Sequence, residues 1–361
     1  MIKIVQHRLI LLSHIVIIVI LHGCLDPTDT NELMTKNSLD IKSQQLNYCQ
    51  GDTLYDLPFA NSSTLGDGLT KETAFIICNS KQFNQIGLLP ETWDKYFILM
   101  ADINLIEFKD EDYNQIGTEV IPFTGELDGN NKTIFNFIVT HGEENRVGIF
   151  SNLATPAVIK NLSIEDVKVI GHNYVAVLAA VNHGGLIDNI HIDADYVIGN
   201  HYVGGITAVH SSGKIVNSSV TFNPFNISAD DNVDDEEFED IDLYGNKYVG
   251  GIAGMVDSGS VNDSSVDIDK IQNNGSYTGG ITGYNVEGII REINVEISTS
   301  LIGNSNVGGV VGRNNGTIIH AYGIIEDIIG IGDNVGGIIG YNQNGWLFES
   351  NITINSSVVG K

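Results

Sequence analysis

The sequence predicts an all-β protein built as a parallel β-solenoid of about seven coils, each 28–29 residues long. Three observations predict this fold. A short phrase containing Gly-Gly recurs at a nearly constant interval, an alternating apolar segment follows each copy, and 40 of the 361 residues are glycine. Charged residues make up 17% of the chain, and its 42% hydrophobic content excludes wholesale disorder.

The repeat is defined by the first residue of its phrase. The phrase is complete in five copies, as in Val249-Gly250-Gly251-Ile252, and degenerate in the two that precede them. Successive copies begin 28, 28, 46, 29, 29 and 28 residues apart, at Val147, Val175, Val203, Val249, Thr278, Val307 and Val335. Because one unit cannot bury its apolar face alone, the units are expected to stack.

Each repeat also contains a strand in which apolar and polar residues alternate, as in Ile190-His191-Ile192 and from Ile293 to Ile297. This alternation places the apolar side chains on one face. Asn-Gly, Gly-Asn and Ser-Gly pairs lie between the strands, where we expect left-handed turns. The Gly-Gly pairs are expected to let adjacent backbones approach closely, since no phosphate-binding glycine motif is present.

Residues 1–23 have the features of a signal peptide. Lys3 and Arg8 form a short basic region before an apolar run from Leu9 to Leu21. That run is shorter than the roughly 20 residues of a spanning helix. We therefore expect it to be removed on export.

The sequence Leu21-His22-Gly23-Cys24 resembles the lipobox of bacterial lipoproteins. The resemblance implies cleavage before Cys24 and a diacylglycerol group on its thiol, and Leu25 in place of aspartate favours the outer membrane. Residues 24–47 are polar and without periodicity, as expected of a lipid-anchored tether. The alternative is an ordinary secretory signal with a chance cysteine, and hence a secreted protein.

Residues 48–140 are expected to form an N-terminal cap and the first coils, ahead of the solenoid at 141–361. Asn79 and Gln82 have the spacing of a capping box, which predicts one short helix over the first coil. If Cys24 is lipidated, Cys49 and Cys78 are the remaining pair for a disulfide in an oxidising compartment. The alternative is two unpaired thiols.

The 46-residue interval implies an insertion of about 18 residues at 224–243. Nine carboxylates fall within it, at Asp230, Asp231, Asp234, Asp235, Glu236, Glu237, Glu239, Asp240 and Asp242. Calcium would neutralise their mutual repulsion with oxygen ligands, although EF-hand spacing is absent. A solvated loop without metal is the alternative.

The phrase V-G-G-I-x-G-x-N, with the alternating strand after it, resembles the GLUG repeat of bacterial surface proteins. Gly66-Asp67-Gly68, Ala74 to Cys78 and Tyr96 to Leu105 resemble the segment that usually accompanies those repeats. The resemblance covers about residues 64–358. It implies a secreted or surface-attached, adhesin-like protein, and such repeats also occur beside catalytic domains such as IgA-directed metallopeptidases.

The sequence contains none of three catalytic or metal-binding patterns: H-E-x-x-H, zinc-ligand spacing and G-x-S-x-G. His172 and His201 are expected at equivalent places in neighbouring coils, either as a metal pair or as adjacent surface imidazoles. Asp188, Asp193 and Asp195 lie near one strand, where paired carboxylates would suit glycoside cleavage. The alternative for these aspartates is an ordinary solvent-facing position.

The net charge of −27 argues against nucleic-acid binding, because phosphates would be repelled. The sequence favours a non-enzymatic, adhesin-like or ligand-presenting protein on the cell surface, with an extended solenoid face. The expected partner is an extracellular glycan or a host or matrix protein, with membrane contact only through the lipid. No cofactor is expected apart from calcium at the insertion.

Two alternatives remain: a β-helix glycan-active enzyme (lyase or hydrolase), and a passive structural spacer. Ten N-x-Ser/Thr acceptors are also present. A eukaryotic origin would therefore imply glycosylation in place of lipid.

Overall fold

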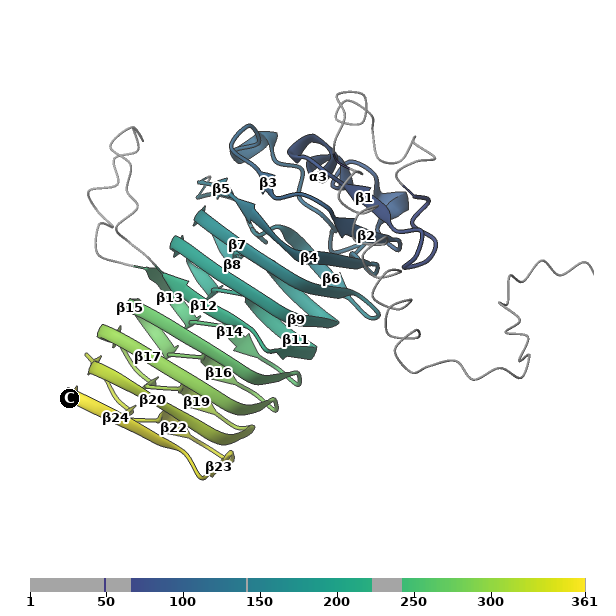
Figure 1. The fold of residues 1–361 in the computed structure, drawn as a ribbon. Coiled ribbons are helices and arrows are strands. Elements are labelled where there is room, and N and C mark those ends of the chain that lie inside the picture. Colours follow the sequence, from purple (N-terminus) through teal and green to yellow (C-terminus); the bar gives the residue numbers. More distant parts are fainter. Residues whose placement is uncertain (1–48, 50–65, 141, 223–241, 361) are drawn as a thin grey trace, which may run out of the picture. The chain divides into compact units, whose positions relative to one another are not determined.

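Parallel hydrogen bonding between successive coils organises the chain (Figure 1). The computed structural model describes residues 49, 66–140, 142–222 and 242–360, within one compact unit, Tyr48–Lys361. The solenoid has about 8 turns, which confirms the predicted fold class with roughly one turn more than expected. The signal peptide, Cys24 and the tether at 24–47 lie outside the described residues.

The N-terminal part of the described chain contains short strands, one α-helix and two 3-10 helices. In chain order these are β1 (Phe75–Ile77), α3 (Ser80–Ile86), η2 (Pro90–Thr92), β2 (Tyr96–Leu99), β3 (Ile103–Asn104), η3 (Asp110–Asp112), β4 (Glu126–Phe135) and β5 (Ile138–Val139).

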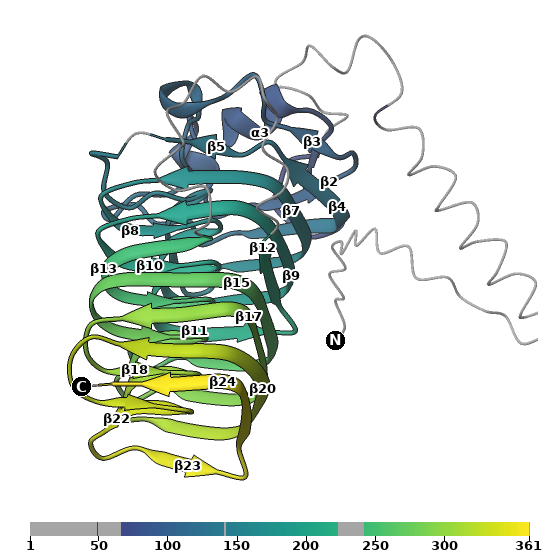
Figure 2. The ribbon, with the colours of Figure 1, turned by 90° about the vertical axis from the view of Figure 1, so that its left-hand side faces the viewer.

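The coils that follow are built from strands alone among the described residues. Up to the insertion they are β6 (Phe150–Ala154), β7 (Val158–Ile170), β8 (Asn173–Ala176), β9 (Ala179–Ile198), β10 (His201–Gly204), β11 (Thr207–Val216) and β12 (Ser219–Phe222). After it come β13 (Leu243–Gly250), β14 (Ala253–Val256), β15 (Ser260–Gly279), β16 (Thr282–Asn285), β17 (Ile289–Gly303), β18 (Val307–Gly308), β19 (Val311–Asn314), β20 (Thr317–Gly330), β21 (Val335–Gly336), β22 (Ile339–Asn342), β23 (Trp346–Phe348) and β24 (Asn351–Val359). Long strands such as β9, β15 and β17 bend round the edge of the stack, so one strand contributes to two faces (Figure 2).

Columns of apolar side chains in register form the core. The predicted starting residues of the repeats pair in one such column, from Val147–Val175 through Val307–Val335. A longer column runs through Phe75, Phe97, Leu127, Ile159, Ile187, Ile215, Val261, Ile290, Ile318 and Leu347. All members but the last are buried. Each coil therefore covers the apolar face of its neighbour, as stacking requires.

The insertion leaves the stack unbroken on both sides. Strand β12 ends at Phe222 and β13 begins at Leu243, which pairs in register with Val197 of the preceding coil. Leu243 therefore belongs to the core rather than to the predicted insertion at 224–243, since its apolar side chain fills a buried column position. Residues 223–241 lie outside the described residues.

Glycine pairs allow the chain to fold inward against the opposite wall. A Cβ at Gly251 would lie 2.4 Å from the carbonyl oxygen of Gly280 and 2.7 Å from Val266 Cγ1. A Cβ at Gly280 would lie 2.4 Å from the Gly309 oxygen. These gaps are too short for any side chain, which confirms the structural interpretation of the pairs.

Left-handed residues occupy two bends of each coil. Ser212-Gly213 fits the turns expected at glycine pairs, with φ of 89° at Gly213, but most left-handed residues here are not glycines. The bend before each repeat phrase, termed the tyrosine bend, uses Arg146, Tyr174, Tyr202, Tyr248, Tyr277, Asn306 and Asn334. The bend within the long strands, termed the acidic bend, uses Asn161, Asn189, Asn217, Asp263, Glu292, His320 and Glu349. The prediction missed these bends because side chains other than glycine rarely adopt this conformation.

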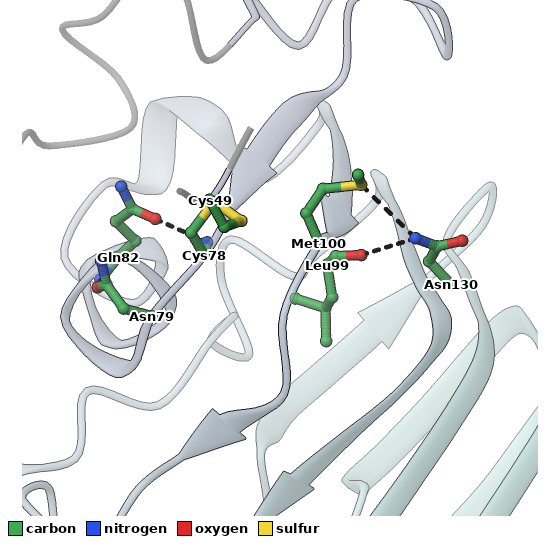
Figure 3. Close-up of a disulfide and its surroundings, with 7 residues drawn as sticks. All are labelled: Cys49, Cys78, Asn79, Gln82, Leu99, Met100 and Asn130. Atoms are coloured by element: carbon green, nitrogen blue, oxygen red, sulfur yellow. Dashed lines mark hydrogen bonds between the residues drawn. A yellow bond between two sulfur atoms is a disulfide. The ribbon is translucent and has the colours of Figure 1, made fainter. Parts of the chain in front are cut away.

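The helix predicted from the capping-box spacing is α3. Asn79 Oδ1 accepts a hydrogen bond from Gln82 N at 2.9 Å, while Gln82 Oε1 accepts from Cys78 N at 2.7 Å (Figure 3). The return bond therefore reaches the residue before the cap rather than the cap itself. Phe83 and Ile86 are buried against the core, so α3 covers the first coil as expected.

The two ends of the stack differ in burial. Phe75, the first member of the long column, is 7% exposed, whereas Leu347, the last, is 41% exposed. Tilted aromatic rings fill the N-terminal end, with 5.5 Å between the centroids of Phe75 and Phe97 and 6.1 Å between those of Phe97 and Phe123.

Candidate binding face of the solenoid

The tyrosine bend forms a continuous stack of rings. Centroids of successive rings from Tyr174 through Tyr202 and Tyr248 to Tyr277 lie 4.8, 4.7 and 4.8 Å apart, with interplanar angles of 5–6°. Burial, together with the neighbouring Tyr248 and Tyr174, raises the pKa of Tyr202. The inner rings of the stack cover each other's faces, so those faces are closed to a ligand.

Cations cover further ring faces of this bend. The Arg146 guanidinium lies 5.0 Å from the centroid of Tyr174, and Lys247 Nζ lies 4.8 Å from that of Tyr248. Outside the bend, in β16, Tyr284 is covered similarly by Arg313 at 5.0 Å. Such contacts stabilise a ring stack. The tyrosine bend is therefore a structural element.

The acidic bend changes in character along the stack. In its first coils amides bond to one another, with Asn189 Nδ2 donating to Asn161 Oδ1 at 3.1 Å. In the last four coils Asp263, Glu292, His320 and Glu349 replace the amides. His320 Nδ1 lies 2.5 Å from Glu292 Oε1, and its Nε2 lies 3.1 Å from Glu349 Oε2.

A shallow hollow of about 350 Å³ lies on this bend. Side chains from β15, β17 and β20 line it: Asp263, Ser264, Ser265, Glu292, Ile293, Asn294 and Tyr322. The Tyr322 side chain is 45% exposed, whereas Ile293 is 1% exposed and packs into the core. The hollow therefore combines carboxylates, an amide, hydroxyl groups and an accessible aromatic ring.

Electrostatics around the hollow are strongly acidic. Asp267 and Glu296 pair in register on the same strands and are exposed. Hydrogen bonds that His320 donates to Glu292 and then to Glu349 raise the pKa of His320. Among the described residues, no lysine or arginine lines the hollow, and His320 contacts its lining residue Glu292. The arrangement suits a ligand that supplies positive charge or hydrogen-bond donors.

A second polar column lies inside the wall for most of its length. Asn285 Nδ2 donates to Asn314 Oδ1 at 2.9 Å, and Asn314 Nδ2 to Asn342 Oδ1 at 3.1 Å. His210 occupies the equivalent position next to Asn182, and burial lowers its pKa to about 4. The amides of Asn285 and Asn314 are buried and donate to backbone oxygens at the turns, so we assign them a structural role.

The structure brings the two predicted cysteine partners together. Cys49 and Cys78 form a disulfide with an S–S distance of 2.07 Å and a Cα–Cα distance of 5.5 Å. Figure 3 shows it beside the start of α3. It therefore ties Cys49 to the residue that follows β1.

Most of the predicted calcium ligands lie outside the described residues. Those are Asp230, Asp231, Asp234, Asp235, Glu236, Glu237, Glu239 and Asp240. Asp242 instead lies in the wall, with 0% exposure, where its Oδ2 accepts from Lys270 N at 2.9 Å. Burial raises the pKa of Asp242 to about 7. Its backbone oxygen accepts from Val197 N, so Asp242 belongs to the coil rather than to a solvated insertion.

His172 and His201 do not occupy equivalent places, contrary to the prediction. The register set by the core valines pairs His201 with Asn173, and His172 lies beside Asn200. The residue equivalent to His201 is therefore Asn173, one position after His172. Among the described side chains, no group of three or more His, Cys, Asp or Glu is arranged to hold a metal ion.

The three aspartates considered for glycoside cleavage are separated by the acidic bend at Asn189. Asp188 Oδ1 accepts from Asn217 Nδ2 at 2.9 Å, before the bend. Asp193 lies beyond it, in register with Glu165 and Thr221, and Asp195 is 8% exposed. Burial first, then Asp193, raises the pKa of Glu165. Asp188 thus lies on a different face from Asp193.

Sequence reasoning missed the hollow although a signal for it exists. Asp263 and Glu292 are separated by one repeat length, and Asn294 pairs with Tyr322 one coil further on. Adding 28 or 29 to each polar position on the alternating strands would have placed these side chains together.

Comparison with known proteins supports the fold and a distant relationship. No protein-family model matches the chain, so the resemblance to GLUG repeats stays a prediction. Over 126 residues, 33% of this chain, the sequence is 30% identical to halomucin of Haloquadratum walsbyi. The match spans 1% of halomucin's length.

A solved structure shares the fold. It is a candidate immunoglobulin A1 protease from Bacteroides ovatus, with a TM-score of 0.52 over 81% of this chain and 80% of that one. At 15% identity the likeness concerns the fold alone. No helix in the described part of the chain is long and apolar enough to span a membrane.

Proposed function

We propose that this protein is an extracellular, surface-attached binding protein that holds its ligand on the acidic bend of the solenoid without transforming it. The observation that supports the proposal is the hollow over β15, β17 and β20, where an exposed ring, an amide and carboxylates converge. Stacked coils offer a long rigid surface on which such groups keep fixed spacing. The partial similarity to halomucin fits a surface or extracellular location.

Attachment through Cys24 is part of the proposal. The lipid on Cys24 would insert into the outer membrane of a Gram-negative cell. The tether at 24–47 would then connect this lipid to the solenoid. Mass spectrometry of the native protein tests this, because a diacylglyceryl group on Cys24 changes the intact mass. A Cys24→Ala variant should then be recovered in the soluble fraction rather than with membranes.

Binding is tested by immobilising the mature chain and screening extracellular glycans and matrix proteins. We expect at least one class to bind wild type and to bind Tyr322→Ala more weakly. Tyr341→Ala is a matched control, since Tyr341 is 39% exposed but does not line the hollow. Absence of binding to every immobilised ligand would favour the passive spacer.

A glycan-active enzyme is the second candidate. Its supporting observation is the pair of carboxylates, Asp263 and Glu292, contributed to one hollow by adjacent coils. Glycoside hydrolases use two such groups. Release of reducing ends from a polysaccharide by wild type, and its loss in Glu292→Gln, would replace the binding proposal.

A further inference from the structure

The hollow differs from the rest of the acidic bend because an exposed aromatic ring lies beside carboxylates of neighbouring coils. Asp263 has no hydrogen bond or ion pair among the described residues, whereas Glu292, one coil further on, pairs with His320 through Oε1. Neighbouring coils are spaced by about 4.8 Å. Like charges this close destabilise the folded chain unless something compensates them.

A second pair of carboxylates extends the same surface. Asp267 and Glu296 pair directly across β15 and β17, four residues further along each strand. The column between the two pairs contains Ser265 and Asn294, followed by Tyr322 and Asn351 in the next two coils. Two acidic pairs thus flank a polar column that includes an exposed aromatic ring.

Apolar surface completes the arrangement. Tyr322 is 45% exposed, and Ile324, two residues on along β20, is 47% exposed. Alternate residues of a strand share one face, so both side chains lie next to the acidic pairs. A ligand for this surface needs an apolar stem and a cationic head.

We propose that the hollow binds a basic, extended polypeptide segment through its lysine or arginine side chains. This inference rests on the proposed binding function and specifies its partner. The side-chain stems would lie against Tyr322 and Ile324, and the cations would meet Asp263, Glu292 and the pair beyond them. With a net charge of −27, the protein attracts such a segment and repels an acidic polysaccharide.

The test measures binding of labelled peptides to the full mature chain by fluorescence anisotropy. The first probe alternates lysine and serine, which places every lysine on one face of an extended peptide. The comparison probes replace lysine by glutamine or by glutamate. A glucosamine oligomer separates a general response to amines from recognition of a peptide.

We expect the lysine peptide to bind, the other two peptides not to bind, and affinity to fall as salt is added. The double variant Asp263→Asn/Glu292→Gln should weaken binding about tenfold, as expected when charge pairs to a cationic ligand are removed. Tyr322→Ala should weaken it less, and Tyr322→Phe should retain it, because the ring face is kept. The matched control Glu72→Gln/Glu91→Gln removes the same charge from the cap and should leave affinity unchanged.

Equal loss in the control variant, or equal binding of the glutamine peptide, would overturn the inference. Tighter binding of the glucosamine oligomer than of the lysine peptide would also overturn it in favour of an amino glycan. In each of these cases, a ligand found in the glycan and matrix screen would leave the proposed binding function intact. If wild type binds nothing in either experiment, the proposed function itself fails.

Discussion

The two left-handed bends have the same backbone conformation but different side chains. The tyrosine bend repeats one ring in four successive coils, and each ring lies against the next at 4.7–4.8 Å. The acidic bend begins with bonded amides and ends with carboxylates around His320. A column whose side chains contact one another has a structural role. A column with carboxylates in register offers those carboxylates to a cationic partner.

The largest expected effect comes from breaking the tyrosine stack. Tyr248→Ala removes three ring contacts and one cation–π contact, so we expect the free energy of unfolding to fall by about 3 kcal/mol. Denaturant unfolding measures it. Tyr322→Ala removes the same side chain from the acidic side, where we expect a loss below about 1 kcal/mol. Equal losses would mean that the two bends do not differ in role.

The next prediction compares a carboxylate inside the wall with those on the acidic bend. The folded-state pKa of Asp242 is about 7, above its unfolded value of 3.8. Asp242 therefore favours folding below about pH 4, and that contribution is lost as pH rises toward 7. At pH 8 we expect Asp242→Asn to be more stable than wild type by about 2 kcal/mol, roughly half of the full cost of that shift, since the site can open toward water.

Unfolding curves at pH 4 and pH 8 measure this difference. At pH 4 the two proteins should unfold alike. Asp333→Asn, at an exposed position, is the control and should change stability little at either pH. If Asp242→Asn were more stable than wild type by the same amount at both pH values, ionisation of Asp242 would not be the cause of its added stability.

A smaller effect concerns the His320 contacts. The pKa of His320 is raised by its two glutamate partners, so protonated His320 stabilises the fold at low pH. This contribution is complete below the unfolded pKa and disappears as pH rises through the higher folded value. The Tm difference between wild type and His320→Asn should therefore shrink from pH 5 to pH 8. Asparagine tolerates the left-handed conformation, and a constant difference would exclude a charge effect.

The smallest effect is expected from the insertion. Phe222 and Leu243 keep their register on either side, so replacing 223–241 by a short linker should leave Tm in EDTA nearly unchanged. If calcium binds the acidic segment, wild type should gain stability with added calcium and the deletion variant should not. An equal calcium response would remove the metal hypothesis, and a large loss in EDTA would mean that the segment packs on the core.

The sequence predicted the register of the coils because large apolar residues can occupy only inward positions. The starting residues of the repeats, from Val147 to Val335, pair as their spacing indicated. The cap helix followed from Asn79, whose side chain has one local partner to satisfy. Both results depend on features that are visible in the sequence itself: the spacing of apolar residues and a cap residue three positions before its partner.

The sequence predicted the surface less well. A tyrosine precedes the repeat phrase in four successive coils, yet its left-handed conformation is unfavourable for an isolated residue and becomes stable only through stacking on its neighbours. The hollow needs three coils at once, and His201 shows that a one-residue error in register assigns the wrong neighbours. Burial of Asp242 depends on where the chain rejoins the wall, which composition does not indicate.

Hydrogen bonds between coils run along the axis of the stack, and this has a mechanical consequence. Force applied at the last coil would load these bonds one coil at a time, as in an unzipping duplex, rather than shearing many together. Each released coil of 28 residues would lengthen the chain by about 100 Å at full extension. The coil with the insertion would release about 160 Å, and so would mark its own position in a pulling trace. Such a stack would lengthen stepwise under tension while the coils below the break keep their shape.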